Sequence, residues 1–72
     1  MVIKVRFKMR DQRLLKMLTL EELAEKVGVS QGFLSDVENG NKVPSLAVAC
    51  KIATALGCTL NDIIECEKSE GE

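Results

Sequence analysis

Three cysteines, Cys50, Cys58 and Cys66, carry the most reactive groups in this 72-residue sequence, which has no histidine. They are widely spaced and form no CxxC pair, so we expect neither a zinc site nor a disulfide framework. We interpret them as reduced thiols that act as small core residues. The sequence also shows no nucleophile beside a base and no glycine-rich phosphate loop. We therefore expect no enzyme activity, no metal site and no cofactor.

The most informative stretch is residues 20–39, LEELAEKVGVSQGFLSDVEN, which predicts two short helices joined by a tight turn. Ala24 lies midway along the first helix, where a closely crossing second helix tolerates only a small side chain. Gly28 follows that helix, where a left-handed residue ends it at little cost. The apolar residues spaced to enter one core are Leu23, Val27, Val29, Leu34 and Val37. Such a pair leaves its second helix projecting, in position to enter a DNA major groove.

Caps and apolar spacing predict four helices and a final short turn. The expected helices span about 9–17, 19–28, 30–39 and 45–57, and the short turn lies at 59–63. The apolar side of the first helix is predicted to comprise Leu14, Leu15, Met17 and Leu18. The predicted core face of the fourth helix comprises Leu46, Ala49, Ile52, Ala53 and Leu56.

The N-terminal segment alternates apolar Ile3, Val5 and Phe7 with basic residues, which predicts a β-strand. A lone strand is unstable and needs a partner. One candidate is residues 63–67, IIECE, whose acidic residues could face the basic ones; the other is the same strand of a second subunit. We expect a single domain over residues 1–67 and a disordered tail over 68–72.

Charge is distributed unevenly along a chain of net charge −1. Residues 1–18 carry six basic residues and one acidic residue, a net +5, whereas residues 59–72 carry a net −4. This layout fits one basic binding face and equally fits two solvated ends that bind nothing. No apolar run is long enough to span a membrane, and the N-terminus is unlike a signal peptide, so we expect a cytoplasmic protein.

The strings LTLEELAEKVGVS, LSDVENG and PSLAVACKIATALG resemble, in order and spacing, the lambda-repressor-like helix-turn-helix family of Cro and XRE-type regulators. The resemblance covers roughly residues 9–64 and implies an all-α bundle of four to five short helices, here with a short N-terminal strand. It also implies a sequence-specific DNA-binding transcriptional regulator that inserts the helix at about 30–39 into the major groove. Such regulators bind two-part operators in double-stranded DNA as homodimers.

The resemblance places Gln31, Gly32, Phe33 and Asp36 at the positions that contact bases. The Gln31 amide can donate to N7 of adenine and accept from N6 of the same base. Gly32 reads nothing but permits close approach of the backbone. Phe33 could contact a thymine methyl group or equally cover a neighbouring helix. Asp36 could accept from cytosine N4, but phosphates repel it, so its carboxylate either weakens binding or points aside.

Phosphate contacts are expected from helix N-termini and nearby polar residues, namely Thr19, Ser30, Ser35, Asn39, Asn41 and Lys42. Thr19 and Ser30 also cap helices, so they serve a purpose even without DNA. Lys42 is the better test, because it has no evident structural duty. The resemblance further implies a structural ion pair between Arg13 and Glu38, which ties the first helix to the third.

A second hypothesis remains open from the sequence: an antitoxin or adaptor that uses the same scaffold to bind a partner protein. The near-zero net charge, Asp36 and the acidic C-terminal end favour it. The two hypotheses differ in their response to salt. Neutralisation of phosphates predicts an affinity that falls steeply with salt, whereas an apolar protein interface predicts little change.

Overall fold

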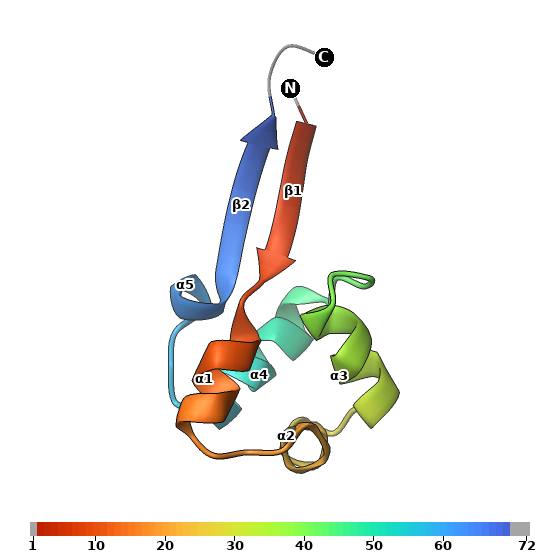
Figure 1. Cartoon of the computed structure of the whole chain (residues 1–72), viewed down its shortest axis with the longest axis vertical. Coiled ribbons are helices and arrows are strands. Elements are labelled where there is room, and N and C mark those ends of the chain that lie inside the picture. The colour runs from red at the N-terminus through yellow and green to blue at the C-terminus, as the bar shows by residue number, and fades with distance from the viewer. Residues whose placement is uncertain (1, 70–72) are drawn as a thin grey trace.

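The computed structural model describes residues 2–69, which form five short helices and a two-stranded sheet (Figure 1). The elements in chain order are β1 (Val2–Phe7), α1 (Met9–Leu15), α2 (Leu20–Val27), α3 (Gln31–Glu38), α4 (Leu46–Leu56), α5 (Leu60–Ile63) and β2 (Ile64–Ser69). The expected all-α bundle with an added strand is therefore confirmed. No helix in the described part of the chain is long and apolar enough to cross a membrane.

An aliphatic core holds the helices together. Its buried members come from every helix and comprise Met9, Leu23, Ala24, Val27, Leu34, Val37, Ile52, Ala53, Leu56 and Ile63. Val29 and Phe33 are half-buried and pack against this cluster. Burial of apolar surface is the main favourable contribution to folding, so these residues hold α2 and α3 in their crossed arrangement.

Local capping fixes where the helices begin and end. Thr19, Ser30 and Ser45 stand at the N-caps of α2, α3 and α4, and each side chain accepts a hydrogen bond from a backbone N–H three residues later. Gly28 and Gly57 end α2 and α4 in the left-handed conformation, with φ of 85° and 71°. The capping positions read from the sequence are confirmed at all five ends.

The N-terminal strand pairs within the same chain, as one of the two alternatives predicted. β1 and β2 are antiparallel, with Val5 opposite Cys66 and Arg6 opposite Glu65. A backbone hydrogen bond of 2.6 Å from Lys8 N–H to Ile63 O ties the base of this ribbon to α5. β2 continues to Ser69, because β1 offers backbone partners as far as Val2; a disordered tail beginning at residue 68 was therefore wrong for residues 68 and 69. Residues 70–72 lie outside the described range.

The predicted apolar side of α1 was wrong for three of its four residues, and only Leu18, in the loop after the helix, packs against the core. The helix ends at Leu15, and Leu14, Leu15 and Met17 are exposed, whereas Met9 at its first turn is fully buried. The helix therefore turns its first residues, not its last, toward the core. Leu46 in the first turn of α4 is likewise exposed and is not part of the core face.

The interpretation of all three cysteines as core residues was also wrong. Cys50 and Cys66 are exposed, and Cys58 is half-buried against the core. Burial raises the pKa of the Cys58 thiol, and the nearby Asp62 carboxylate raises it further. All three are free thiols.

Candidate nucleic-acid interface

The turn between α2 and α3 sets the direction in which α3 projects. The backbone N–H groups of Gly28 and Val29 both donate to the carbonyl of Ala24, at 2.8 and 3.1 Å. These bonds satisfy the Ala24 carbonyl in the last turn of α2 while the left-handed Gly28 reverses the chain. Leu34 and Val37 then anchor α3 from below, because both are buried in the core. The opposite side of α3 is left free to contact another molecule.

The N-terminus of α3 presents its first two residues to solvent. Ser30 caps the helix, with its hydroxyl accepting from the Phe33 N–H at 3.1 Å. Gln31 and Gly32 are exposed, and a Cβ built on Gly32 would meet no atom within 4 Å. Glycine at this position is therefore not required by packing within the chain.

Phe33, Asp36 and Lys42 form one cluster on α3 and the loop after it. The Lys42 Nζ lies 3.5 Å from an Asp36 carboxylate oxygen and 5.7 Å from the centroid of the Phe33 ring. The ion pair neutralises the carboxylate that would repel phosphates, and it occupies the lysine that would attract them. The expectation that Lys42 has no structural duty was therefore wrong. Little in the sequence indicated this ion pair. Asp36 and Lys42 are six positions apart, and they meet only because the loop after α3 folds back.

The C-terminal end of α3 gathers the remaining polar candidates. Asn39 is the C-cap, and its side-chain amide lies 3.5 Å from the Ser35 hydroxyl. Asn41 and Lys42 both donate their backbone N–H groups to the Asp36 carbonyl, at 2.8 and 3.3 Å. Asn39 and Asn41 are exposed and Ser35 is half-buried. The structure therefore brings these residues together, and their contacts with phosphate stay a prediction.

Thr19 serves as the N-cap of α2. Its hydroxyl accepts from the Glu22 N–H at 3.1 Å, and its own N–H donates to the Glu22 carboxylate at 2.8 Å. The second bond holds the pKa of the Glu22 carboxyl below its usual range. Glu21 and Glu22 make this helix start acidic, which disfavours a phosphate beside Thr19.

The ion pair expected between Arg13 and Glu38 is present. The Arg13 Nε lies 2.7 Å from Glu38 Oε2, and both side chains are largely buried. Arg13 also donates to the Leu18 carbonyl at 2.8 Å, which links α1, α3 and the loop before α2. Arg10, which the sequence did not single out, joins the pair at 3.3 Å from Glu38 Oε1.

Acidic neighbours neutralise much of the basic N-terminal segment. Arg6 pairs with Glu67 at 3.4 Å and lies 4.0 Å from Glu65, and Lys8 lies 3.9 Å from Glu65. These exposed pairs are individually weak. Together they place the acidic C-terminal segment directly beside the basic strand, so the +5 segment does not form a separate basic face.

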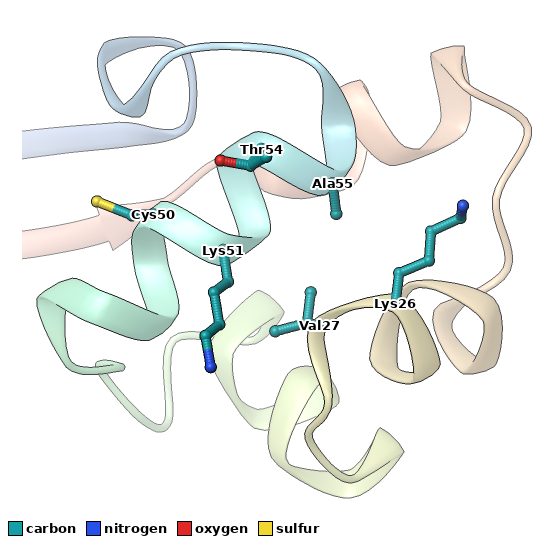
Figure 2. Close-up of a pocket in the computed structure, with 6 residues that line it drawn as sticks. All are labelled: Lys26, Val27, Cys50, Lys51, Thr54 and Ala55. Carbon is teal, nitrogen blue, oxygen red and sulfur yellow. The ribbon is translucent and has the colours of Figure 1, made fainter.

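The described chain has an open groove that Gln31 and Gly32 do not line. This groove, of about 730 Å³, lies between the end of α2 and α4 (Figure 2). Its lining comprises Lys26, Val27, Cys50, Lys51, Thr54 and Ala55. Among the described residues, no three His, Cys, Asp or Glu side chains gather in a way that could hold a metal ion.

Comparison with known proteins gives a consistent result. A helix-turn-helix family model matches residues 9–63. The chain is 41% identical over 63 residues to an uncharacterized HTH-type transcriptional regulator of Methanocaldococcus jannaschii, covering 88% of this chain and 96% of that protein. It is also similar to the crystal structure of the clp gene regulator ClgR from Corynebacterium glutamicum, with 40% identity and a TM-score of 0.74. That match covers 76% of this chain and 58% of the ClgR chain.

A further similar structure is the restriction-modification controller protein C.AhdI from Aeromonas hydrophila. It is 33% identical, with a TM-score of 0.73, and the match covers 76% of this chain and 83% of that chain. The region matched by the family model, residues 9–63, contains α1 to α5.

Proposed function

Because this chain belongs to the helix-turn-helix family of DNA-binding transcriptional regulators, we propose that it inserts α3 into the major groove as a homodimer on a two-part operator. The matched region spans α1 to α5, so the proposal concerns how that domain meets DNA. It assigns the base-reading contact to Gln31, the close approach to the bases to Gly32, and contacts with DNA phosphates to residues at the two ends of α3. It assigns no catalytic role and no cofactor. The cytoplasmic location stays a prediction.

The exposed start of α3 is the observation that carries the proposal. Gln31 and Gly32 stand clear of the core, while Ser30 caps the helix and Leu34 anchors it. A side-chain amide on a rigid helix can form two hydrogen bonds with adenine in the major groove. The absence of a side chain at Gly32 leaves room for the helix to approach a base pair closely.

The ion pair between Asp36 and Lys42 opposes DNA binding, because it must be broken before Lys42 can contact a phosphate. Lys42 reaches a phosphate only by leaving Asp36, because its Nζ now lies 3.5 Å from that carboxylate. We expect DNA to displace this pair, since phosphates attract the lysine and repel the aspartate. Binding through Lys42 is therefore weaker than binding through an unpaired lysine.

The experiment is selection of bound duplexes from a random double-stranded DNA pool, followed by fluorescence anisotropy at several salt concentrations. The proposal predicts enrichment of a two-part motif and an affinity that falls steeply as salt rises. Folding is checked by circular dichroism. Failure to enrich any sequence, with no binding at low salt and micromolar protein, would refute the proposal.

The alternative is a scaffold that binds a protein, as an antitoxin or adaptor. The acidic start of α2 and the Asp36–Lys42 pair favour it, because both reduce attraction to phosphate. It predicts that the affinity for the partner protein changes little with salt. Substitution of Gln31 should leave that affinity unchanged. The same anisotropy series separates the two, since only DNA binding shows the steep salt dependence.

A further inference from the structure

Three lysines of the helical bundle stand without an acidic partner. The basic side chains that form ion pairs are Arg6, Lys8, Arg10, Arg13 and Lys42. In the described part of the chain, no ion pair involves Lys16, Lys26 or Lys51. Glu22 lies one turn before Lys26 on α2, but its carboxylate accepts the Thr19 N–H at 2.8 Å instead. The charge of these three lysines is therefore available to a ligand.

The three lysines surround two hollows that run together between α2 and α4. The open groove of about 730 Å³ is lined in part by Lys26 and Lys51. A second hollow of about 260 Å³ shares Lys26, Thr54 and Ala55 with it and adds Lys16. We call the two hollows together the lysine groove. Among the described residues, no acidic side chain lines either part of it.

The floor of the lysine groove is apolar. Figure 2 shows Val27 and Ala55 lying between the two lysine side chains that line the larger hollow. Val27 is buried and Ala55 is half-buried, and both pack with the helical core. The floor is therefore held in place by the fold, because packed core residues have little freedom to move.

Two of the lysines also have a role within the chain. A Cβ built on Gly57, at the end of α4, would lie 3.6 Å from the Lys16 Nζ. Lys26 lies in the last turn of α2. A cation at the C-terminal end of a helix is favourable, so both positions suit the helices as well. Lys51 lies in the middle of α4, where this explanation does not apply.

We propose that the lysine groove docks an acidic peptide segment of a partner protein. Carboxylates of the segment lie against the lysines, and a small apolar side chain lies on the floor. Charge complementarity is the argument, because three unpaired charges of one sign attract an acidic partner and repel a basic one. The inference goes beyond the proposed function and does not rest on it.

The composition of the groove favours a peptide over DNA. The residues that line it are different from all those to which contacts with DNA are assigned. DNA phosphates are bound by polar side chains, backbone N–H groups and helix N-termini, and an apolar floor offers them nothing. The floor would stay uncovered under a DNA backbone, whereas an apolar side chain of a peptide fills it.

The open shape of the groove favours a peptide over a small anion. Sites for small ligands enclose most of the ligand surface. A small anion at the lysines would remain largely in water and leave the floor bare. An extended peptide turns successive side chains to opposite sides, so it can present carboxylates and an apolar side chain at different points along the groove.

The test is an NMR titration of the full isotope-labelled chain without DNA. The probe is a pool of peptides of about ten residues, or about 33 Å when extended, in which Asp or Glu alternates with Val, Leu or Ala. The control pool carries Asn or Gln in place of the acidic residues. The acidic pool should shift the amide signals of Val27, Lys51 and Ala55 and leave that of Gln31 unchanged. The neutral pool should bind about tenfold more weakly, as expected for the loss of several exposed charge pairs.

Two variants and a matched control assign the binding to the lysines. The double variant Lys26→Gln, Lys51→Gln should weaken binding of the acidic pool about fivefold. Lys4→Gln removes an unpaired lysine of the ribbon, outside the groove, and should bind as wild type does. The charge reversal Lys26→Glu, Lys51→Glu should lose the acidic pool and bind a pool with Lys or Arg in its place. All three positions are exposed, and circular dichroism checks that each variant folds.

Four results would overturn the inference. The first is an acidic pool that shifts no signal of the groove at about 1 mM, where even a weak contact is detected. The second is equal binding of the neutral pool or of the double glutamine variant. The third is citrate that shifts the same signals at the same concentration, because attraction of any anion then explains them. The fourth is a double glutamine variant that loses affinity for the selected duplex, because the lysines are then phosphate contacts.

The inference and the proposed function fail separately. The peptide titration contains no DNA, and the anisotropy measurement contains no peptide. Peptide binding without duplex binding at low salt contradicts only the proposed function. Duplex binding without any shift in the groove contradicts only the docking of an acidic peptide.

Discussion

Loss of Arg13 should destabilise the fold far more than loss of Arg10, although both contact Glu38. The Glu38 side chain is 2% exposed and Arg13 is 13% exposed, whereas Arg10 is 59% exposed. Replacing Arg13 by Met keeps much of the side-chain length but leaves a buried carboxylate with one solvated partner. It also removes the hydrogen bond to the Leu18 carbonyl.

The magnitude follows from burial. Removing one partner of a buried ion pair costs about 3–5 kcal/mol, because the remaining charge stays out of water. Exposed pairs contribute about 0–1 kcal/mol, which sets the expectation for Arg10→Met. In a domain of this size 1 kcal/mol shifts the Tm by about 4–8 °C. Arg13→Met should therefore lower the Tm by about 12 °C or more, and Arg10→Met by less than about 8 °C.

Thermal and urea unfolding followed by circular dichroism measure both variants. The double variant Arg13→Met, Glu38→Leu should recover part of the loss, since it leaves no buried charge without a partner. If Arg13→Met costs no more than Arg10→Met, Glu38 is not buried as the structure shows and the reasoning fails. If the double variant is worse than the single one, packing rather than charge determines the loss.

Three further predictions concern α3 and the helix caps. Gly32→Ala should raise the free energy of unfolding by about 0.5–1 kcal/mol, because its Cβ meets nothing within the chain, and should weaken DNA binding; an unchanged affinity in anisotropy would contradict a close approach to DNA. Asp36→Asn should free Lys42, raise DNA affinity and steepen its salt dependence by about one unit of slope; a lower affinity would argue against the proposed role of the pair. The pKa values of Glu22 and Asp62 are lowered chiefly because each carboxylate accepts a cap N–H, so their contribution to stability is present above the unfolded pKa and is lost as pH falls. Urea unfolding from about pH 5 to pH 3 should lose stability more steeply in wild type than in Glu22→Gln, Asp62→Asn, and equal slopes would contradict this assignment.

Signals that act within a few residues were readable from the sequence. Thr19, Ser30 and Ser45 were recognised as N-caps because a cap depends on one side chain and a backbone group three residues away. Gly28 and Gly57 were recognised because left-handed backbone favours glycine. The ribbon partner was one of two alternatives that the sequence left open, and the structure pairs β1 with β2, with Arg6 opposite Glu65.

Features that depend on how the helices sit against one another were missed. Apolar residues at the end of α1 were assigned to the core, but spacing alone does not tell which side of a short helix faces inward. In the structure Met9 at the start of α1 is buried, whereas Leu15 at its end is 74% exposed. The Asp36–Lys42 pair depends on the loop after α3 turning back. The Arg10 contact depends on α1 and α3 being neighbours.

The base contact by Gln31 is the most direct test of the account. We expect Gln31→Ala to keep the fold, because the side chain is exposed, and to lower affinity for the selected duplex by about 1–3 kcal/mol, or roughly fivefold to 150-fold. Preference for adenine at one position of each half-site should disappear. Asn61→Ala, an exposed amide on α5, is the matched control and should bind as wild type does. Unchanged affinity and base preference in Gln31→Ala would show that the start of α3 does not read DNA.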